Sequence, residues 1–134
     1  MKTYTHGRTC VYNINYHFVW CVKYHRKVLS PVIESRLQNI LYETGHHYGF
    51  TVAAVEVGER DHVHCFVSAP PKISISEIIA MLKSISARRL FAEFPHLRKT
   101  LWGGNLWSGS YFVETVGSTS EENVRRYIEN QANY

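Results

Sequence analysis

The alternation of side chains over residues 10–24, CVYNINYHFVWCVKY, constrains the fold more than any other feature of this sequence. In a β-strand, successive side chains point to opposite faces, so positions two apart share a face. One face of this segment is apolar and the other is more polar, so we predict a long strand with one face on a core. The apolar face consists of Tyr12, Ile14, Tyr16, Phe18, Trp20 and Val22. The more polar face consists of Val11, Asn13, Asn15, His17, Val19 and Cys21.

Capping residues mark three helices. Ser30 precedes a proline and a run of apolar residues at helical spacing, and Gly49 is a suitable stop, so we expect a helix between them. The Ser-x-x-Glu patterns at 74–77 and 118–121 match capping boxes. They predict a second helix and a short terminal helix.

Three more strands complete the pattern. Residues 50–57, FTVAAVEV, and a strand that begins at His62 are expected to pair as a hairpin across the turn GERD. Residues 111–116, YFVETV, form the fourth predicted strand, after a glycine-rich loop at 97–110. The order is strand, helix, strand, strand, helix, strand, helix.

This order predicts an α+β fold of the ferredoxin-like (RRM-like) βαββαβ type, with a further helix at the C-terminus. In that architecture helices cover one face of an antiparallel sheet, and we expect the other face to stay open. We treat residues 1–134 as a single domain, which suits a chain of this length.

Composition narrows the setting. Fifteen Lys and Arg against eleven Asp and Glu give a net charge of +4, a modest excess that favours a polyanionic partner. No apolar run is long enough to span a membrane, and the N-terminus lacks the apolar stretch of a signal peptide. The three cysteines are odd in number and lie in strand-like segments, which favours a reduced cytosolic setting, and the absence of a CxxC argues against a cysteine-bound zinc site.

Two histidines lie one residue apart in the segment DHVHCFVSAP, residues 61–70. In a strand, His62 and His64 share a face with Phe66. The pair either binds a metal, which requires further ligands, or is solvated. The terminal helix offers Tyr127 and Gln131 as neighbours on one stripe, although the residues alone allow a packed aromatic ring and a solvated end residue.

These segments together resemble a known family. DHVHCFVSAPP, followed by VRRYIENQ at 124–131, is similar to the HUH motif and nucleophile helix of the single-tyrosine HUH transposases. This is the TnpA family of insertion sequences that move as single-stranded DNA, with the REP-associated tyrosine transposases among its relatives. NYHFVWCVKYHRKVL and LWGGNLWSGSYFVETV resemble other parts of that family, and the similarity runs from about residue 10 to 131.

The resemblance implies a metal-dependent DNA strand transferase. Tyr127 matches the nucleophile, which attacks a phosphodiester of single-stranded DNA and forms a 5′-phosphotyrosine with a free 3′-OH. His62, His64 and Gln131 match the ligands of a divalent cation, Mg²⁺ or Mn²⁺. The family resemblance further implies a homodimer that recognises imperfect-palindrome hairpins, in the cytoplasm and on the nucleoid when DNA is bound.

Residues that contact DNA are harder to identify, because each basic side chain can bind phosphate or lie on a solvated face. The candidates are Lys23, Arg26, Lys27, Lys83, Arg88, Arg98 and Lys99. Trp102 and Trp107 either stack on bases or anchor their loop to the core. Asp61 either orients a ligand histidine or is a plain turn residue.

Other functions remain possible from the sequence. Ferredoxin-like sheets also bind RNA or DNA without catalysis, although that interpretation leaves the HxH and YxxxQ patterns unexplained. A domesticated relative that cleaves palindromes without mobilising itself has the same sequence pattern. A histidine-triad hydrolase needs a third alternating histidine where this chain has Phe66.

Overall fold

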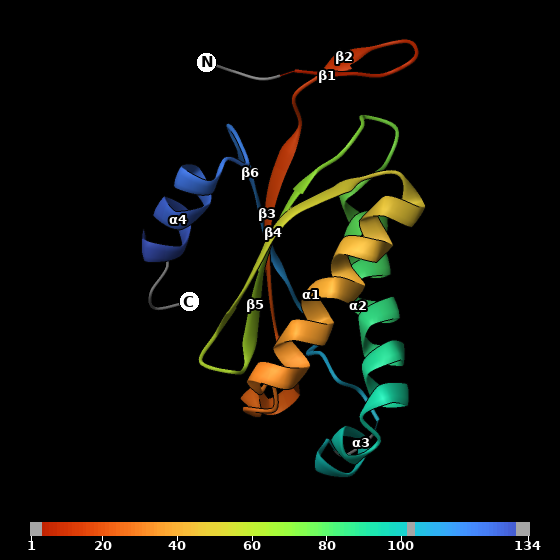
Figure 1. Ribbon diagram of the computed structural model, residues 1–134, viewed down its shortest axis with the longest axis vertical. Coiled ribbons are helices and arrows are strands. Elements are labelled where there is room, and N and C mark those ends of the chain that lie inside the picture. Colours follow the sequence, from red (N-terminus) through yellow and green to blue (C-terminus); the bar gives the residue numbers. More distant parts are fainter. Residues whose placement is uncertain (1–3, 102–103, 131–134) are drawn as a thin grey trace.

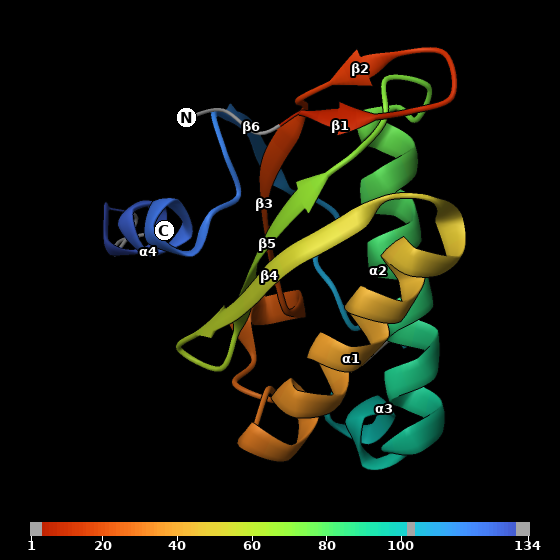
Figure 2. The same cartoon turned by 45° about the horizontal axis from the view of Figure 1, so that its top comes forward.

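The computed structural model describes residues 4–101 and 104–130, which form a four-stranded antiparallel sheet between helices (Figure 1). In spatial order the strands are β4 (Thr51–Gly58), β5 (His62–Ser68), β3 (Asn15–Cys21) and β6 (Phe112–Val116). Helices α1 (Pro31–Tyr48) and α2 (Ile75–Glu93) cover one face, and α4 (Glu121–Asn130) lies on the other (Figure 2). The predicted βαββαβ order with a terminal helix is confirmed.

Helix α1 begins and ends at the predicted residues, and α2 begins at the predicted capping box. Ser30 Oγ accepts a hydrogen bond from the Ile33 amide at 3.4 Å, and Gly49 ends α1 with a φ of 86°, a left-handed conformation that glycine adopts without strain. Ser74 and Glu77 form the predicted reciprocal capping box at the start of α2.

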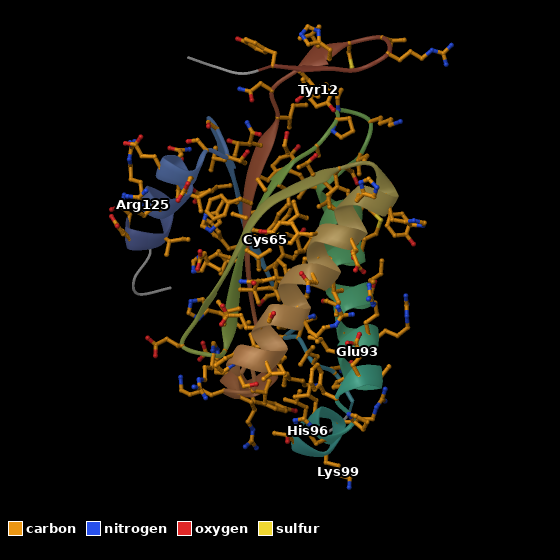
Figure 3. The ribbon with its side chains drawn as sticks, viewed as in Figure 1. Tyr12, Cys65, Glu93, His96, Lys99 and Arg125 are labelled. Carbon is orange, nitrogen blue, oxygen red and sulfur yellow. The ribbon has the colours of Figure 1, made fainter. Side chains whose placement is uncertain are left out.

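The core lies between the sheet and these two helices. Phe18, Trp20 and Val22 are buried there, as predicted, together with Val63 and the neighbouring alternate residues of β5. Figure 3 shows Cys65 at the centre of this layer. Burial of each large apolar side chain contributes roughly 1.5–3 kcal/mol, so this layer fixes the sheet and the orientation of its opposite face.

The prediction of one long strand over residues 10–24 is wrong at its start. Val11–Tyr12 form β2, which pairs with β1 (Thr5–His6) in a separate hairpin that projects beyond the sheet (Figure 1). Strand β3 begins at Asn15, whose partners Ser68 and Val116 are the last residues of β5 and β6. Upstream of Asn15, the Ala69 amide still donates a hydrogen bond to the Ile14 carbonyl at 3.0 Å, but both neighbouring strands have ended.

Three local predictions also need correction. The loop predicted at 97–110 includes a short helix, α3 (His96–Thr100), and the basic turn after β3 contains a 3-10 helix at Lys23–His25. The terminal helix is capped by Ser120 rather than Ser118, because Ser120 Oγ accepts a hydrogen bond from the Asn123 amide at 3.3 Å.

The expectation that the second face of the sheet stays open is wrong. His17 and Phe66 are 0% exposed on this face, and His64 is 3% exposed. The terminal helix is amphipathic and packs here through Val124, which is buried. The site is therefore a sheltered layer between sheet and helix. In the described ranges, no helix is both long and apolar enough to cross a membrane.

Candidate active site

Strands β3 and β5 bring three histidines together on the face under α4. His17 pairs with Phe66 and Val19 pairs with His64 in the antiparallel register, so His17 and His64 are diagonal neighbours. Their Nε2 and Nδ1 atoms share a hydrogen bond across 2.9 Å. The His62 ring lies edge-on to the His64 ring, with centroids 5.2 Å apart.

Tyr127 lies against this cluster. Its ring centroid is 5.9 Å from that of His17 and 6.3 Å from that of Phe66, and the side chain is half-buried. Val124, one turn earlier on α4, is the buried residue that fixes the helix on the sheet. The structure thus brings the predicted tyrosine to the face that carries the predicted histidines.

His62 is held from two sides. Its Nδ1–H donates a hydrogen bond to Asp61 Oδ1 at 2.8 Å, and Lys27 Nζ lies 3.5 Å from Asp61 Oδ2. A Cβ placed on Gly58, its partner in β4, would overlap with Nε2 and Cε1 of the imidazole. The structure therefore supports Asp61 as a residue that orients His62, and Gly58 provides the space for the ring.

Burial keeps two of the imidazoles neutral. It lowers the pKa of His17 to about 4, and it lowers the pKa of His64 to about 4 with a further contribution from the charges of His17 and His62. Neutral imidazole is the form that binds a metal ion. Near neutral pH, these two side chains are ready to act as ligands or hydrogen-bond partners without losing a proton first.

The residues described fit part of a metal site. His62 and His64 each form a hydrogen bond through Nδ1, so a cation would be held through Nε2, the usual arrangement for ligand histidines. No cluster of three or more His, Cys, Asp or Glu side chains suited to a metal occurs within residues 4–101 and 104–130. A third ligand would be of another kind, such as an amide or phosphate oxygen, and the predicted Gln131 lies outside the described residues.

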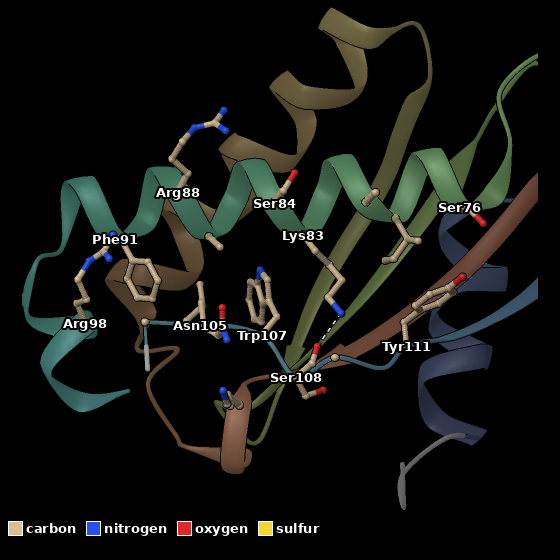
Figure 4. Close-up of a pocket in the computed structure, with 17 residues that line it drawn as sticks. Ser76, Lys83, Ser84, Arg88, Phe91, Arg98, Asn105, Trp107, Ser108 and Tyr111 are labelled. Carbon is tan, nitrogen blue, oxygen red and sulfur yellow. Dashed lines mark hydrogen bonds between the residues drawn. The ribbon is translucent and has the colours of Figure 1, made fainter. Parts of the chain in front are cut away.

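Four of the predicted basic residues line one groove of about 870 Å³ between α2 and residues 104–111 (Figure 4). No acidic side chain is among the described residues that line it. The four cationic residues are Lys23, Lys83, Arg88 and Arg98.

The wall of this groove is partly fixed by its own cations. Lys83 Nζ donates hydrogen bonds to the carbonyl oxygens of Ser108 at 2.7 Å and Ser110 at 3.3 Å, and burial lowers the pKa of Lys83. The Arg98 guanidinium lies 4.7 Å from the centroid of the Phe91 ring. The groove therefore combines positive charge with a rigid backbone.

The other predicted basic residues lie elsewhere. Lys27 is held near Asp61, Arg26 is exposed beside the 3-10 turn, and Lys99 is exposed on α3 (Figure 3). The interpretation of Trp107 as an anchor is confirmed, because it is 7% exposed and its Nε1–H donates to Ser86 Oγ at 3.0 Å. Trp102 lies outside the described residues.

Sequence reasoning assigned no role to His17 or Gly58. Alternation placed His17 on the right face, but its contact with His64 depends on the pairing of β3 with β5, which the sequence does not specify. Gly58 carried no signal, because its role appears only once the His62 ring is seen above it.

Comparisons with known proteins find relatives over nearly the whole chain. The family model described as "Transposase IS200 like" matches residues 10–131. The chain is 42% identical over 125 residues to ISDra2 transposase TnpA of Deinococcus radiodurans, and the matched residues cover 93% of this chain and 89% of that protein. It is 28% identical over 130 residues to the IS200 transposase of Salmonella typhimurium, with 97% of this chain and 82% of that protein covered.

Solved structures show the same fold. A putative transposase from Deinococcus radiodurans superimposes with a TM-score of 0.78 at 40% identity, over 95% of this chain and 97% of the other. A REP-associated tyrosine transposase bound to a REP hairpin gives a TM-score of 0.59 at 14% identity, over 93% of this chain and 68% of the other. The second likeness bears on the fold alone.

Proposed function

Because this chain belongs to the IS200-like transposase family, we propose that it cuts and rejoins single-stranded DNA through a covalent bond to Tyr127. The observation that carries the proposal is the contact of the Tyr127 ring with His17, which is hydrogen-bonded to His64. A tyrosine over the sheet face that carries an HxH pair suits attack on a phosphodiester. Residues 1–134 would then form one domain that holds both nucleophile and ligands.

The reaction balances without ATP. The Tyr127 hydroxyl attacks the phosphorus, the bond from phosphorus to the 3′ oxygen breaks, and the products are a 5′-phosphotyrosine and a 3′-OH. A 3′-OH attacks the phosphotyrosine in the second step, which releases the phenol and reseals the strand. The energy of the phosphodiester is kept in the covalent bond, and phenolate, with a reference pKa near 10, is a reasonable leaving group.

His62 and His64 have the chemistry to hold a divalent cation, with Gln131 as the proposed third ligand. When bound there, Mg²⁺ or Mn²⁺ would polarise the scissile phosphate and stabilise its developing charge. The chain's own contribution is to present two imidazoles on one face of the sheet, each held through Nδ1.

We propose that the groove with four cationic side chains binds the phosphates of hairpin DNA. Its lack of acidic lining residues among those described, and its exposed aromatic residue Tyr111, suit a nucleic acid backbone with adjacent bases. Lys27, which pairs with Asp61, is a weaker candidate because its charge is partly compensated.

We also propose that the active unit is a two-fold dimer. Strand β6 is an edge strand of the four-stranded sheet in the described part of the chain, and a sheet edge is a common place for a second copy of a chain to associate. A dimer would present two sites to the two ends of an element. Its test is the mass of the protein in solution with and without DNA.

The test of the function uses single-stranded DNA that carries a hairpin, with Mg²⁺ or Mn²⁺ and denaturing gels. The wild-type chain should give a covalent protein–DNA adduct. Tyr127→Phe, which removes only the hydroxyl, should give none while still binding the hairpin, because binding depends on other contacts. Tyr48→Phe, at an exposed tyrosine on α1, is the matched control and should form adduct normally. An adduct with Tyr127→Phe would refute the assignment.

A further inference from the structure

His17, which is not part of the HxH pattern, is the most enclosed of the three histidines of the site. His17 is 0% exposed and stacks on Phe66 with centroids 4.3 Å apart and planes 3° from parallel. Tyr127 and Phe112 approach the same ring, with centroids 5.9 and 6.2 Å away. An imidazole within an aromatic box of this kind has a fixed orientation.

The polar contact of His17 is directed at one atom. Its Nε2 lies 2.9 Å from Nδ1 of His64, whereas its own Nδ1 is buried and has no hydrogen-bond partner within residues 4–101 and 104–130. Burial of a polar atom without a partner is unfavourable. A phenylalanine would fill the same box without that cost, so the presence of an imidazole points to the His64 contact.

We propose that His17 is a positioning residue that holds the His64 ring and accepts the Nδ1–H proton of His64, so that Nε2 of His64 is left with the lone pair needed to bind a cation. This inference rests on the proposed function, because it concerns the same metal site. A neutral imidazole carries one ring proton, and a hydrogen bond at one nitrogen decides which nitrogen can ligate. Asp61 performs the equivalent task for His62.

Two substitutions separate this role from simple space filling. His17→Phe keeps a ring of similar size on Phe66 but removes the hydrogen bond. His17→Gln loses the ring but places an amide oxygen near the original Nε2, where it can accept the Nδ1–H proton of His64. If His17 only fills space, the Phe variant should behave as wild type and the Gln variant should be impaired. If His17 positions His64, the Phe variant should be impaired and the Gln variant should be closer to wild type.

The primary measurement is Mn²⁺ binding, followed by electron paramagnetic resonance of free Mn²⁺ at neutral pH without DNA. His17→Phe should bind about 10–100-fold more weakly than wild type, the usual effect when the partner of a ligand histidine is lost. His17→Gln should bind Mn²⁺ more tightly than His17→Phe. Thermal unfolding and hairpin binding should show that the Phe variant is folded.

A second measurement reads the tautomer directly. In the Zn²⁺-loaded protein, long-range proton–nitrogen correlation spectra should show the His64 proton on Nδ1 and protected from exchange in wild type. In His17→Phe this protection should be lost.

Three results would overturn the inference. Equal Mn²⁺ affinity of wild type and His17→Phe, or an unprotected His64 Nδ1–H in wild type, would do so while the metal site itself stood. Failure of wild type to bind Mn²⁺, with cleavage unchanged in EDTA, would overturn the metal site and the positioning role together.

Discussion

Acid should destabilise this protein through the buried pair His17 and His64. Burial lowers the pKa of both from 6.5 to about 4 in the folded chain, so between these values the unfolded chain binds protons that the folded chain does not. Stability is therefore full above pH 6.5 and is lost as the pH falls toward 4. Each group contributes at most about 1.4 kcal/mol per pH unit in that window.

The expected loss is large relative to the total stability. From pH 7 to pH 5 each histidine should remove about 2 kcal/mol and the pair about 4 kcal/mol, against a typical total of about 5–15 kcal/mol for such a domain. The assay is urea unfolding at pH 7, 6 and 5 in EDTA, followed by circular dichroism. This range stays above the reference pKa of the carboxylates, which lies near 4.

Two variants make this prediction specific. His17→Phe removes one of the two titrating groups and should reduce the loss between pH 7 and 5 by about half. His46→Gln removes an exposed imidazole on α1 and is the matched control, which should keep the full loss. Wild-type stability that is flat between pH 7 and 5, or an unchanged slope in His17→Phe, would refute the reasoning.

Three further predictions concern the site and its groove. Gly58→Ala should displace the His62 ring and therefore weaken Mn²⁺ binding and cleavage. The free energy of unfolding should fall by only about 1 kcal/mol, because the His62 side chain can move while the strand is kept. Arg88→Gln should reduce the slope of log affinity for hairpin DNA against log salt by about 0.9, whereas Lys99→Gln, outside the groove, should not; equal slopes would contradict the groove assignment. Mixed Tyr127→Phe and His62→Ala subunits should regain cleavage if a dimer shares its sites, and persistent inactivity together with a monomeric mass would count against the dimer.

The sequence predicted the faces of the strands, both caps of α1 and the start of α2 well because these depend on local signals. Ser30, Gly49 and the box at Ser74 each act through hydrogen bonds or dihedral angles within one turn of helix. Alternation likewise sorted the faces of β3 and β5 correctly. The resemblance to the family, rather than periodicity, supplied the role of Tyr127.

What the sequence did not predict depends on contacts between distant segments. The start of β3 at Asn15 is set by where β5 and β6 end, and the sheltered second face is set by how α4 packs through Val124. The His17–His64 hydrogen bond joins residues 47 positions apart and requires the register of the two strands that carry them. Local patterns hold no information on such distances.

The central claim, a covalent bond between Tyr127 and DNA, is tested most directly by mapping the adduct. Cleavage after Arg126 with trypsin gives the peptide YIENQANY, which contains both Tyr127 and the terminal Tyr134. The adduct formed on hairpin-bearing single-stranded DNA is digested with nuclease and trypsin, and tandem mass spectrometry locates the remaining nucleotide. The account predicts a 5′-phosphoryl nucleotide on Tyr127; a nucleotide on Tyr134 or on any other residue would contradict it.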